Sequence, residues 1–158
     1  MTNGMGPLRT GSVSNPIRCA VLISGSGSGM EAMAIHQQTH LDCGHCTVLV
    51  ISDNAEATGL TKAERLGIPA HCIVLPDETD RTLRRHLHEQ QIQSLLQEYQ
   101  IELILLSGYM RLVSANFIDQ WTPHIINIHP SLLPAFPGAH AHRDVLAAGV
   151  EVSGCTVH

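Results

Sequence analysis

Short apolar runs alternate with longer mixed segments along most of the chain. Each apolar run predicts a buried strand, and we expect strands over residues 18–24, 46–52, 71–75, 101–106, 125–128 and 152–158. The intervening segments predict helices over residues 30–38, 57–66, 80–100, 114–120 and 140–148, and the third of these has apolar residues spaced for one helical face. This alternation predicts an α/β fold of the Rossmann-like kind, with a mainly parallel sheet and helices on both faces.

The start of the chain differs in composition from the rest. Its first 17 residues, MTNGMGPLRTGSVSNPI, are rich in Gly, Ser, Asn and Pro and lack the apolar core of a secretory signal. We therefore expect a disordered N-terminal tail over residues 1–17 and one domain over residues 18–158. No apolar run approaches the roughly 20 residues that a membrane-spanning helix needs.

The net charge of the chain bears on its partners, and its cysteine content bears on its location. The chain has 9 Lys and Arg residues against 14 Asp and Glu residues, for a net charge of -5. An acidic chain without a basic cluster is poorly suited to nucleic acid or to an anionic membrane, so we expect neither as a partner. Five scattered cysteines without a secretory signal favour reduced thiols and a cytoplasmic location. Composition leaves the oligomeric state open.

Three polar or glycine-rich segments lie at the carboxyl ends of predicted strands. They cover residues 24–29, 107–111 and 127–138. In parallel sheets of this kind, ligands bind beyond the carboxyl ends of the strands. We therefore place the candidate site where these three segments meet.

The first of these segments, Ser24-Gly-Ser-Gly-Ser-Gly29, lies between a predicted strand and a predicted helix. Glycines allow the backbone to approach an anion closely, and the N–H groups at a helix start favour phosphate. The third glycine of the dinucleotide fingerprint is replaced by Met30, and the lysine of a P-loop is absent. Two interpretations stay open: a phosphate-binding turn of unspecified type, and a tight turn needed only for packing.

The last segment contains Asn127-Ile-His129-Pro-Ser-Leu-Leu-Pro134. Alternation along a strand sends the Asn127 and His129 side chains to the same face, so both can reach one substrate atom. An amide beside an imidazole suits acyl transfer, because the amide can stabilise an oxyanion and the imidazole has both protonation states near neutral pH. A catalytic pair and a structural histidine at a strand end are the two interpretations of this motif.

Cysteine and histidine spacing gives little support for a metal site. Cys43-Gly-His-Cys46 has metal-ligand spacing, but a zinc site would need a second pair of ligands and the sequence has no second CxxC. An HExxH helix is also absent, although further ligands could come from His129, His140, His142 and His158. We therefore expect no metal, and we expect His88 to lie on a polar helical face without a role.

Four segments resemble the phosphoribosylglycinamide formyltransferase family. They are SGSGSG, SDNAEATGLTKAERLGIP, SGYMRLVS and INIHPSLLPAFPGAHAHRDVLAAGVEVSGCTVH, and they follow in order between Arg18 and His158. The resemblance implies the formyltransferase fold and small-molecule substrates. It further implies transfer of a formyl group from 10-formyltetrahydrofolate, as cosubstrate, to the amino group of 5-phosphoribosylglycinamide in purine biosynthesis, without a metal.

The resemblance also implies roles for individual residues. Asn127 and His129 match the catalytic Asn and His of the family, and the Leu133–Pro134 bond is expected to be cis. The phosphate of the acceptor is expected to lie over Gly27, Ser28, Gly29, Met30 and Glu31. The folate is expected to contact Arg81, Leu106, Met110, Arg111, Leu112, Val113 and Asn127.

Two departures from the family pattern alter these expectations. Gly29 stands where the family usually has Asn. The family also continues past the position of His158 into a loop with a catalytic aspartate, so we expect an incomplete domain over 18–158 and little formyl transfer by residues 1–158 alone. The alternatives are a formyltetrahydrofolate hydrolase, a methionyl-tRNA formyltransferase and a non-catalytic nucleotide-binding paralogue.

Overall fold

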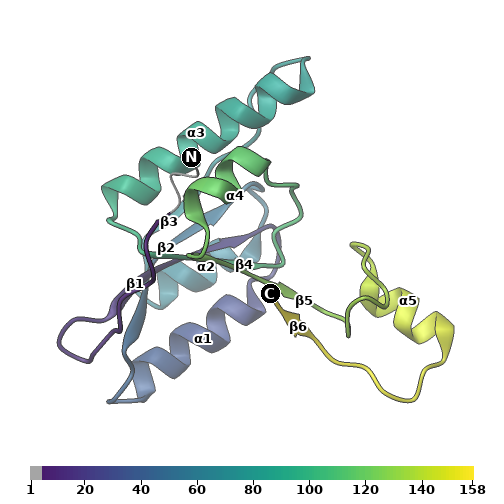
Figure 1. Ribbon diagram of the computed structural model, residues 1–158, viewed down its shortest axis with the longest axis horizontal. Helices are drawn as coiled ribbons and strands as arrows, with labels where there is room; N and C mark the ends of the chain where they lie inside the picture. The colour runs from purple at the N-terminus through teal and green to yellow at the C-terminus, as the bar shows by residue number, and fades with distance from the viewer. Residues whose placement is uncertain (1–4) are drawn as a thin grey trace.

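The structure is a computed structural model that describes residues 5–158 of the chain. Strands and helices alternate from residue 17 onward (Figure 1). The strands are β1 (Ile17–Ile23), β2 (His45–Ser52), β3 (Ala70–Cys72), β4 (Leu103–Ser107), β5 (Ile125–His129) and β6 (Thr156–Val157). The helices are α1 (Ser28–Thr39), α2 (Thr58–Arg65), α3 (Arg81–Glu98), α4 (Ala115–Trp121) and α5 (Ala141–Ala148).

The strands form a sheet in the order β3-β2-β1-β4-β5-β6. Neighbouring strands from β3 to β5 are parallel, and β6 runs antiparallel to β5. β1 lies inside the sheet, where Leu22 pairs with Ile51 of β2 and with Leu106 of β4. The predicted α/β fold with a mainly parallel sheet is confirmed.

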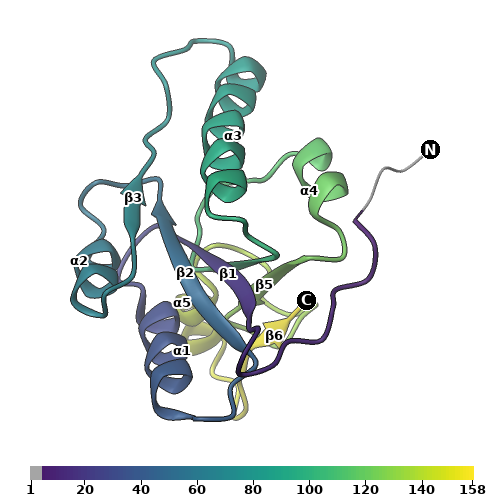
Figure 2. The same cartoon turned by 90° about the vertical axis from the view of Figure 1, so that its left-hand side faces the viewer.

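Helices cover both faces of the sheet because alternate residues of a strand point to opposite faces. Ala20 and Leu22 of β1 belong to a core cluster that also contains residues of α3 and α4. Val21 and Ile23 belong to a second cluster with residues of α1 and α2. Figures 1 and 2 show the two pairs of helices on opposite sides of the sheet, and α5 projecting beyond the carboxyl end of β5.

Strands β3 and β6 are shorter than the sequence predicts by two residues or more. β3 ends at Cys72 rather than at residue 75, because its partner β2 ends at Ser52. β6 begins at Thr156 rather than at residue 152, and Thr156 pairs with His129 of β5. The residue opposite Cys155 would be Pro130, which has no N–H to donate to the ladder. Residues 152–155, which the sequence assigns to this strand, therefore pair with no strand in the described part of the chain.

The segment before β1 contacts the rest of the domain, whereas the sequence predicts a disordered tail over residues 1–17. The Arg9 guanidinium makes a two-pronged ion pair with Glu102, with Nε–Oε1 and Nη2–Oε2 distances of 2.5 and 2.7 Å. The hydrogen bond from Arg9 lowers the pKa of the Glu102 carboxyl. His124 Nε2 also lies 2.7 Å from Gly6 O. The composition of the segment could not predict these contacts, because the contacting residues are far apart in the sequence. Residues 1–4 of the predicted tail lie outside the described residues.

Candidate active site

The carboxyl ends of β1, β4 and β5 lie side by side because these strands are consecutive in the sheet. Near the end of β4, Leu106 pairs with Leu22 of β1 on one side and with Asn127 of β5 on the other. The segments 24–29, 107–111 and 127–138 therefore leave the same edge of the sheet. The structure brings together the three segments in which sequence analysis placed the site.

The turn before α1 presents free backbone donors. Gly27 is the N-cap of α1, with φ of 62°, and a Cβ there would lie 2.9 Å from Gly59 Cα. The first helical bond is Glu31 N to Gly27 O at 2.9 Å. The N–H groups of Ser28, Gly29 and Met30 precede that bond and are the orphan donors of the helix start. They and the helix dipole favour an anion.

Glu31 differs from the other residues expected around the phosphate. Its N–H is used by Gly27 O, and its carboxylate lies 2.7 Å from Lys62 Nζ. Met30 is fully buried in the core under α1, so only its backbone faces the turn. The anion-binding part of the turn is therefore the backbone of residues 28–30.

Asn127 lies on β5 opposite the last residue of the chain. Asn127 N donates to His158 O at 2.7 Å, and His158 N donates to Asn127 O at 3.0 Å. The side-chain Nδ2 of Asn127 lies 2.9 Å from His158 Nε2. The amide carries two N–H donors, so one donor remains for a ligand when the other binds His158.

His129 lies two residues further along β5 and is held by the loop that follows. Its Nε2 lies 2.9 Å from Phe136 O, and a carbonyl can only accept, so Nε2 carries a proton. Ser131 Oγ donates to Ala135 O at 2.6 Å and so ties the same loop. The Leu133–Pro134 bond is cis, as expected. The loop thus fixes the imidazole of His129, and its Nδ1 is the nitrogen left to exchange a proton.

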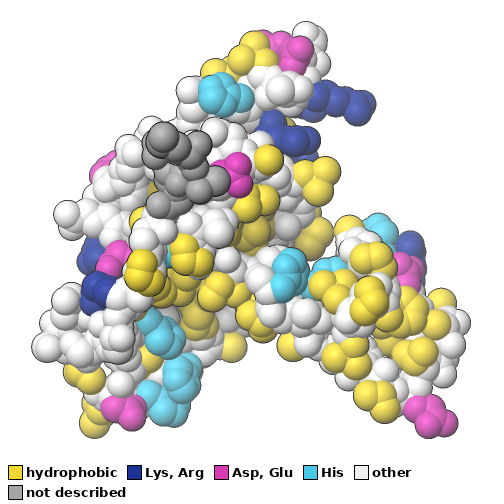
Figure 3. Space-filling view, viewed as in Figure 1, with side chains coloured by type: hydrophobic (Ala, Val, Ile, Leu, Met, Phe, Trp, Pro, Cys, Tyr) yellow, Lys and Arg dark blue, Asp and Glu magenta, His cyan; other side chains and the backbone are white. Residues whose placement is uncertain are grey.

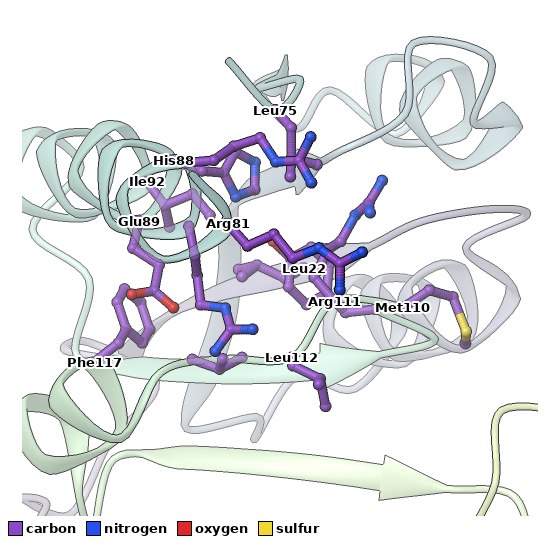
Figure 4. A pocket seen from close by; sticks show the side chains of 14 residues that line it. Leu22, Leu75, Arg81, His88, Glu89, Ile92, Met110, Arg111, Leu112 and Phe117 are labelled. Atoms are coloured by element: carbon purple, nitrogen blue, oxygen red, sulfur yellow. The ribbon is translucent and has the colours of Figure 1, made fainter. Parts of the chain in front are cut away.

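A cavity of about 260 Å³ opens between α3 and the segment after β4 (Figure 4). Five of the residues expected to contact folate line it: Arg81, Met110, Arg111, Leu112 and Val113. Leu106 does not line it and packs instead against the core cluster under α3 and α4. Asn127 is also outside the lining, on the neighbouring strand β5. The remaining lining residues are Leu22, Leu75, Arg84, Arg85, His88, Glu89, Ile92, Tyr109 and Phe117.

The cavity is strongly basic. Of the 9 Lys and Arg residues of the chain, Arg81, Arg84, Arg85 and Arg111 line it. Figure 3 shows basic side chains gathered over one end of α3. Arg111 Nε lies 2.5 Å from Asp53 Oδ2, whereas the three arginines of α3 form no ion pair within residues 5–158. The sequence-based statement that the chain lacks a basic cluster is wrong, because the fold adds Arg111 to the arginines of α3.

Potential metal ligands do not gather in the described part of the chain. Residues 5–158 contain no group of three or more His, Cys, Asp or Glu side chains placed to hold a metal ion. Cys43 Sγ lies 3.4 Å from His45 O. Within the same residues, no helix is long and apolar enough to cross a membrane.

Comparison with known proteins shows the family of the chain. Residues 17–158 match the family model described as formyl transferase. The chain belongs to the formyl transferase family. The matched range includes all six strands, from β1 to β6.

This formyl transferase is similar to named proteins of two kinds. It is 44% identical over 144 residues to the trifunctional purine biosynthetic protein adenosine-3 of Gallus gallus, a match covering 91% of this chain and 14% of that protein. It is 38% identical over 140 residues to phosphoribosylglycinamide formyltransferase of Bacillus subtilis, covering 88% of this chain and 69% of that protein. A crystal structure of the Brucella melitensis phosphoribosylglycinamide formyltransferase superposes with a TM-score of 0.82 at 42% identity, covering 91% and 72% of the two chains. The chain thus spans a small part of the trifunctional relative.

Several residues at the site of this formyl transferase were missed by sequence analysis. His88 was expected on a polar face, but it is buried, its Nε2 lies 2.7 Å from Ile73 O, and it lines the cavity. Burial raises the pKa of Tyr109, so this phenol stays protonated at the cavity wall. Arg81, Arg84, Arg85 and His88 share one face of α3, a spacing visible in the sequence. The side-chain contact from His158 to Asn127 had no such local signal.

Proposed function

We propose that this formyl transferase moves a formyl group from 10-formyltetrahydrofolate to the amino group of 5-phosphoribosylglycinamide, a step of purine biosynthesis. One observation carries the proposal: Asn127 and His129 lie at the sheet edge that also bears the free N–H groups of α1 and the basic cavity beside α3. α1 and α3 cover opposite faces of the sheet. An acceptor and a donor could therefore approach one reacting centre from the two sides.

The acceptor phosphate suits the start of α1. The N–H groups of residues 28–30 and the helix dipole supply donors and positive potential without a basic side chain. An acidic chain that keeps Lys62 paired with Glu31 depends on such backbone donors for phosphate. The amino group of the bound acceptor would then lie toward β4 and β5.

The folate donor suits the cavity. Met110, Leu112 and Val113 offer apolar surface to a flat ring system, and Tyr109 adds an aromatic wall. Arg81, Arg84 and Arg85 bring charge that suits the carboxylates of folate, because guanidinium groups bind carboxylates through two parallel hydrogen bonds. The family membership of the chain supports a folate-borne formyl donor.

The transfer requires one bond to form and one to break. The acceptor amine attacks the formyl carbon, and the carbonyl oxygen becomes an oxyanion. The second N–H of the Asn127 amide stabilises that oxyanion. Collapse breaks the bond between the formyl carbon and N10 of the folate. His129 moves the amine proton to that nitrogen through Nδ1, and the products are the formylated amine and tetrahydrofolate.

A comparison of acceptors tests this function. The full-length protein would be incubated with 10-formyltetrahydrofolate and with 5-phosphoribosylglycinamide, methionyl-tRNA or no acceptor. We expect formylation of 5-phosphoribosylglycinamide only, with tetrahydrofolate released in equal amount. Fast release of formate without acceptor would indicate a hydrolase, and formylated tRNA would indicate the tRNA enzyme. Binding without turnover would indicate a non-catalytic paralogue. The cytoplasmic location and the low activity of residues 1–158 alone stay predictions.

A further inference from the structure

Gly29 and Ser107 approach each other closely at the candidate site. Gly29 is the second residue of α1, and Ser107 is the last residue of β4. A Cβ added to Gly29 would lie 2.5 Å from Ser107 Oγ but 3.8 Å from Ser107 Cβ. The Ser107 hydroxyl therefore points toward the start of α1 and occupies the space that a side chain at position 29 would need.

Ser107 lies between the start of α1 and the part of β5 that carries Asn127 and His129. It pairs with Ile128, which is flanked by Asn127 and His129 on β5. On its other side lies the helix start with the free N–H groups of residues 28–30. A ligand that reached from the α1 turn to Asn127 would have to pass over Ser107.

The Ser107 hydroxyl is half-buried and makes no hydrogen bond within the part of the chain that the structure describes. Other serines at the ends of strands use theirs: Ser24 Oγ accepts from Met110 N at 2.8 Å, and Ser52 Oγ donates to Asn54 O at 3.1 Å. A hydroxyl that is partly shielded from water and has no protein partner keeps both its donor and its acceptor capacity for a ligand. The open hydrogen-bonding capacity of Ser107 faces the start of α1.

We infer that Ser107 is a binding residue for the acceptor phosphate, to which its hydroxyl donates beside the N–H groups of Ser28, Gly29 and Met30. The inference rests on the proposed function and names one further ligand of the same site. The hydroxyl of Ser107, on β4, thus adds a polar group to the backbone donors of α1.

The loss of the hydroxyl tests the binding role. In the full-length protein, Ser107→Ala is expected to weaken the affinity for 5-phosphoribosylglycinamide by about tenfold or more, as a hydrogen bond to a charged group typically does. The affinity for 10-formyltetrahydrofolate should stay unchanged, since that ligand is assigned to the cavity. Calorimetry measures both. Ser94→Ala is the matched control, because Ser94 is exposed on α3 and donates to Gln90 O of its own helix.

The steric relationship is tested separately. Gly29→Ala places a Cβ 2.5 Å from Ser107 Oγ, so the hydroxyl must turn away and the phosphate affinity should fall. In Gly29→Ala with Ser107→Ala, the two Cβ atoms are about 3.8 Å apart, an ordinary contact. Because both variants displace or remove the same hydroxyl, the double variant should bind the phosphate no more weakly than Ser107→Ala alone.

The outcomes separate this inference from the proposed function. If Ser107→Ala binds 5-phosphoribosylglycinamide as tightly as the wild type, while the wild type formylates it, the role of Ser107 is overturned and the function stands. If the wild type does not bind 5-phosphoribosylglycinamide, both are overturned. If Gly29→Ala keeps the wild-type affinity for 5-phosphoribosylglycinamide, the role assigned to the Ser107 hydroxyl is wrong.

Discussion

Asn127 of β5 pairs with His158, the residue that follows β6. Their backbones exchange two hydrogen bonds, of 2.7 and 3.0 Å, and Asn127 Nδ2 lies 2.9 Å from His158 Nε2. An amide held at its backbone and at one N–H has little rotational freedom. Its second N–H is therefore directed before any substrate binds, which is what an oxyanion donor requires.

Replacing Asn127 by Ala should lower kcat by about 10²–10³, the usual cost of losing one oxyanion donor. The affinity for 5-phosphoribosylglycinamide should change little, because the interaction strengthens only when charge develops on the oxygen. Steady-state kinetics and calorimetry on the full-length protein separate the two quantities. A loss confined to affinity would make Asn127 a binding residue.

Replacing His129 by Ala should lower turnover by about 10²–10⁴, the range for general acid–base catalysis. Phosphate binding at α1 should persist, because the turn before α1 follows β1, whereas His129 lies on β5. His142→Ala is a suitable control, because His142 is an exposed histidine of α5. Near-normal turnover in His129→Ala would remove this residue from the mechanism.

The Asp53–Arg111 pair predicts a charge-dependent effect on stability. Asp53 is buried, its Oδ1 has no hydrogen-bond partner among residues 5–158, and its Oδ2 lies 2.5 Å from Arg111 Nε. Arg111→Ala would leave this carboxylate unpaired and should destabilise the fold by about 1–3 kcal/mol, a range at the low end for buried pairs because Arg111 is about half exposed.

Urea unfolding measures this effect, and Asp53→Asn together with Arg111→Ala should recover part of the loss by removing the buried charge. Arg84→Ala, at an arginine of the same cavity without an ion pair in the described residues, should stay within about 0.5 kcal/mol of the wild type. Equal stability of Arg111→Ala and Arg84→Ala would contradict the structural role of the pair.

The fold could be predicted from the sequence because apolar runs and mixed segments alternate regularly along the chain. Every predicted helix and strand has a counterpart, and Ser114, where the helix over residues 114–120 was predicted to begin, is the N-cap of α4, with Phe117 N donating to Ser114 Oγ at 3.2 Å. The lengths of β3 and β6 were not predictable, because they depend on where Ser52 and Pro130 end the partner strands.

The candidate site was predictable only in part. The segments carrying Gly27 and Asn127 were found because glycines after a strand and a polar pair inside an apolar run are local signals. The Asp53–Arg111 pair and the contact between Gly29 and Ser107 join residues far apart in the sequence. No periodicity encodes such pairs; they follow from the strand order β2-β1-β4.

The Arg9–Glu102 pair predicts a pH-dependent contribution of the N-terminal segment. The hydrogen bond from Arg9 lowers the pKa of Glu102 in the folded state. Its contribution is therefore present above the unfolded pKa of a glutamate, and it is lost as pH falls through the lowered folded value. Arg9→Ala should reduce the urea midpoint at pH 7, and the difference from the wild type should become smaller in strong acid. It should not vanish, because Arg9 also donates to Asn15 O and Pro16 O, both at 2.9 Å.

Arg143→Ala provides the matched comparison for Arg9→Ala. Arg143 pairs with the adjacent residue Asp144 on the surface of α5, so it attaches no distant segment. Its removal should leave the midpoint nearly unchanged at both pH values. An Arg9→Ala difference that persists unchanged in acid would show that Arg9 acts through packing and not through the Glu102 charge.

The transfer of a labelled formyl group tests the central claim most directly. The full-length protein would receive 10-formyltetrahydrofolate labelled with ¹³C in the formyl group, together with 5-phosphoribosylglycinamide, and NMR would follow the label. The account predicts that the label moves to the acceptor nitrogen in amount equal to the tetrahydrofolate formed, and that His129→Ala slows this movement without abolishing acceptor binding. Label that appears as free formate, or that stays on the folate while the acceptor is bound, would contradict the account.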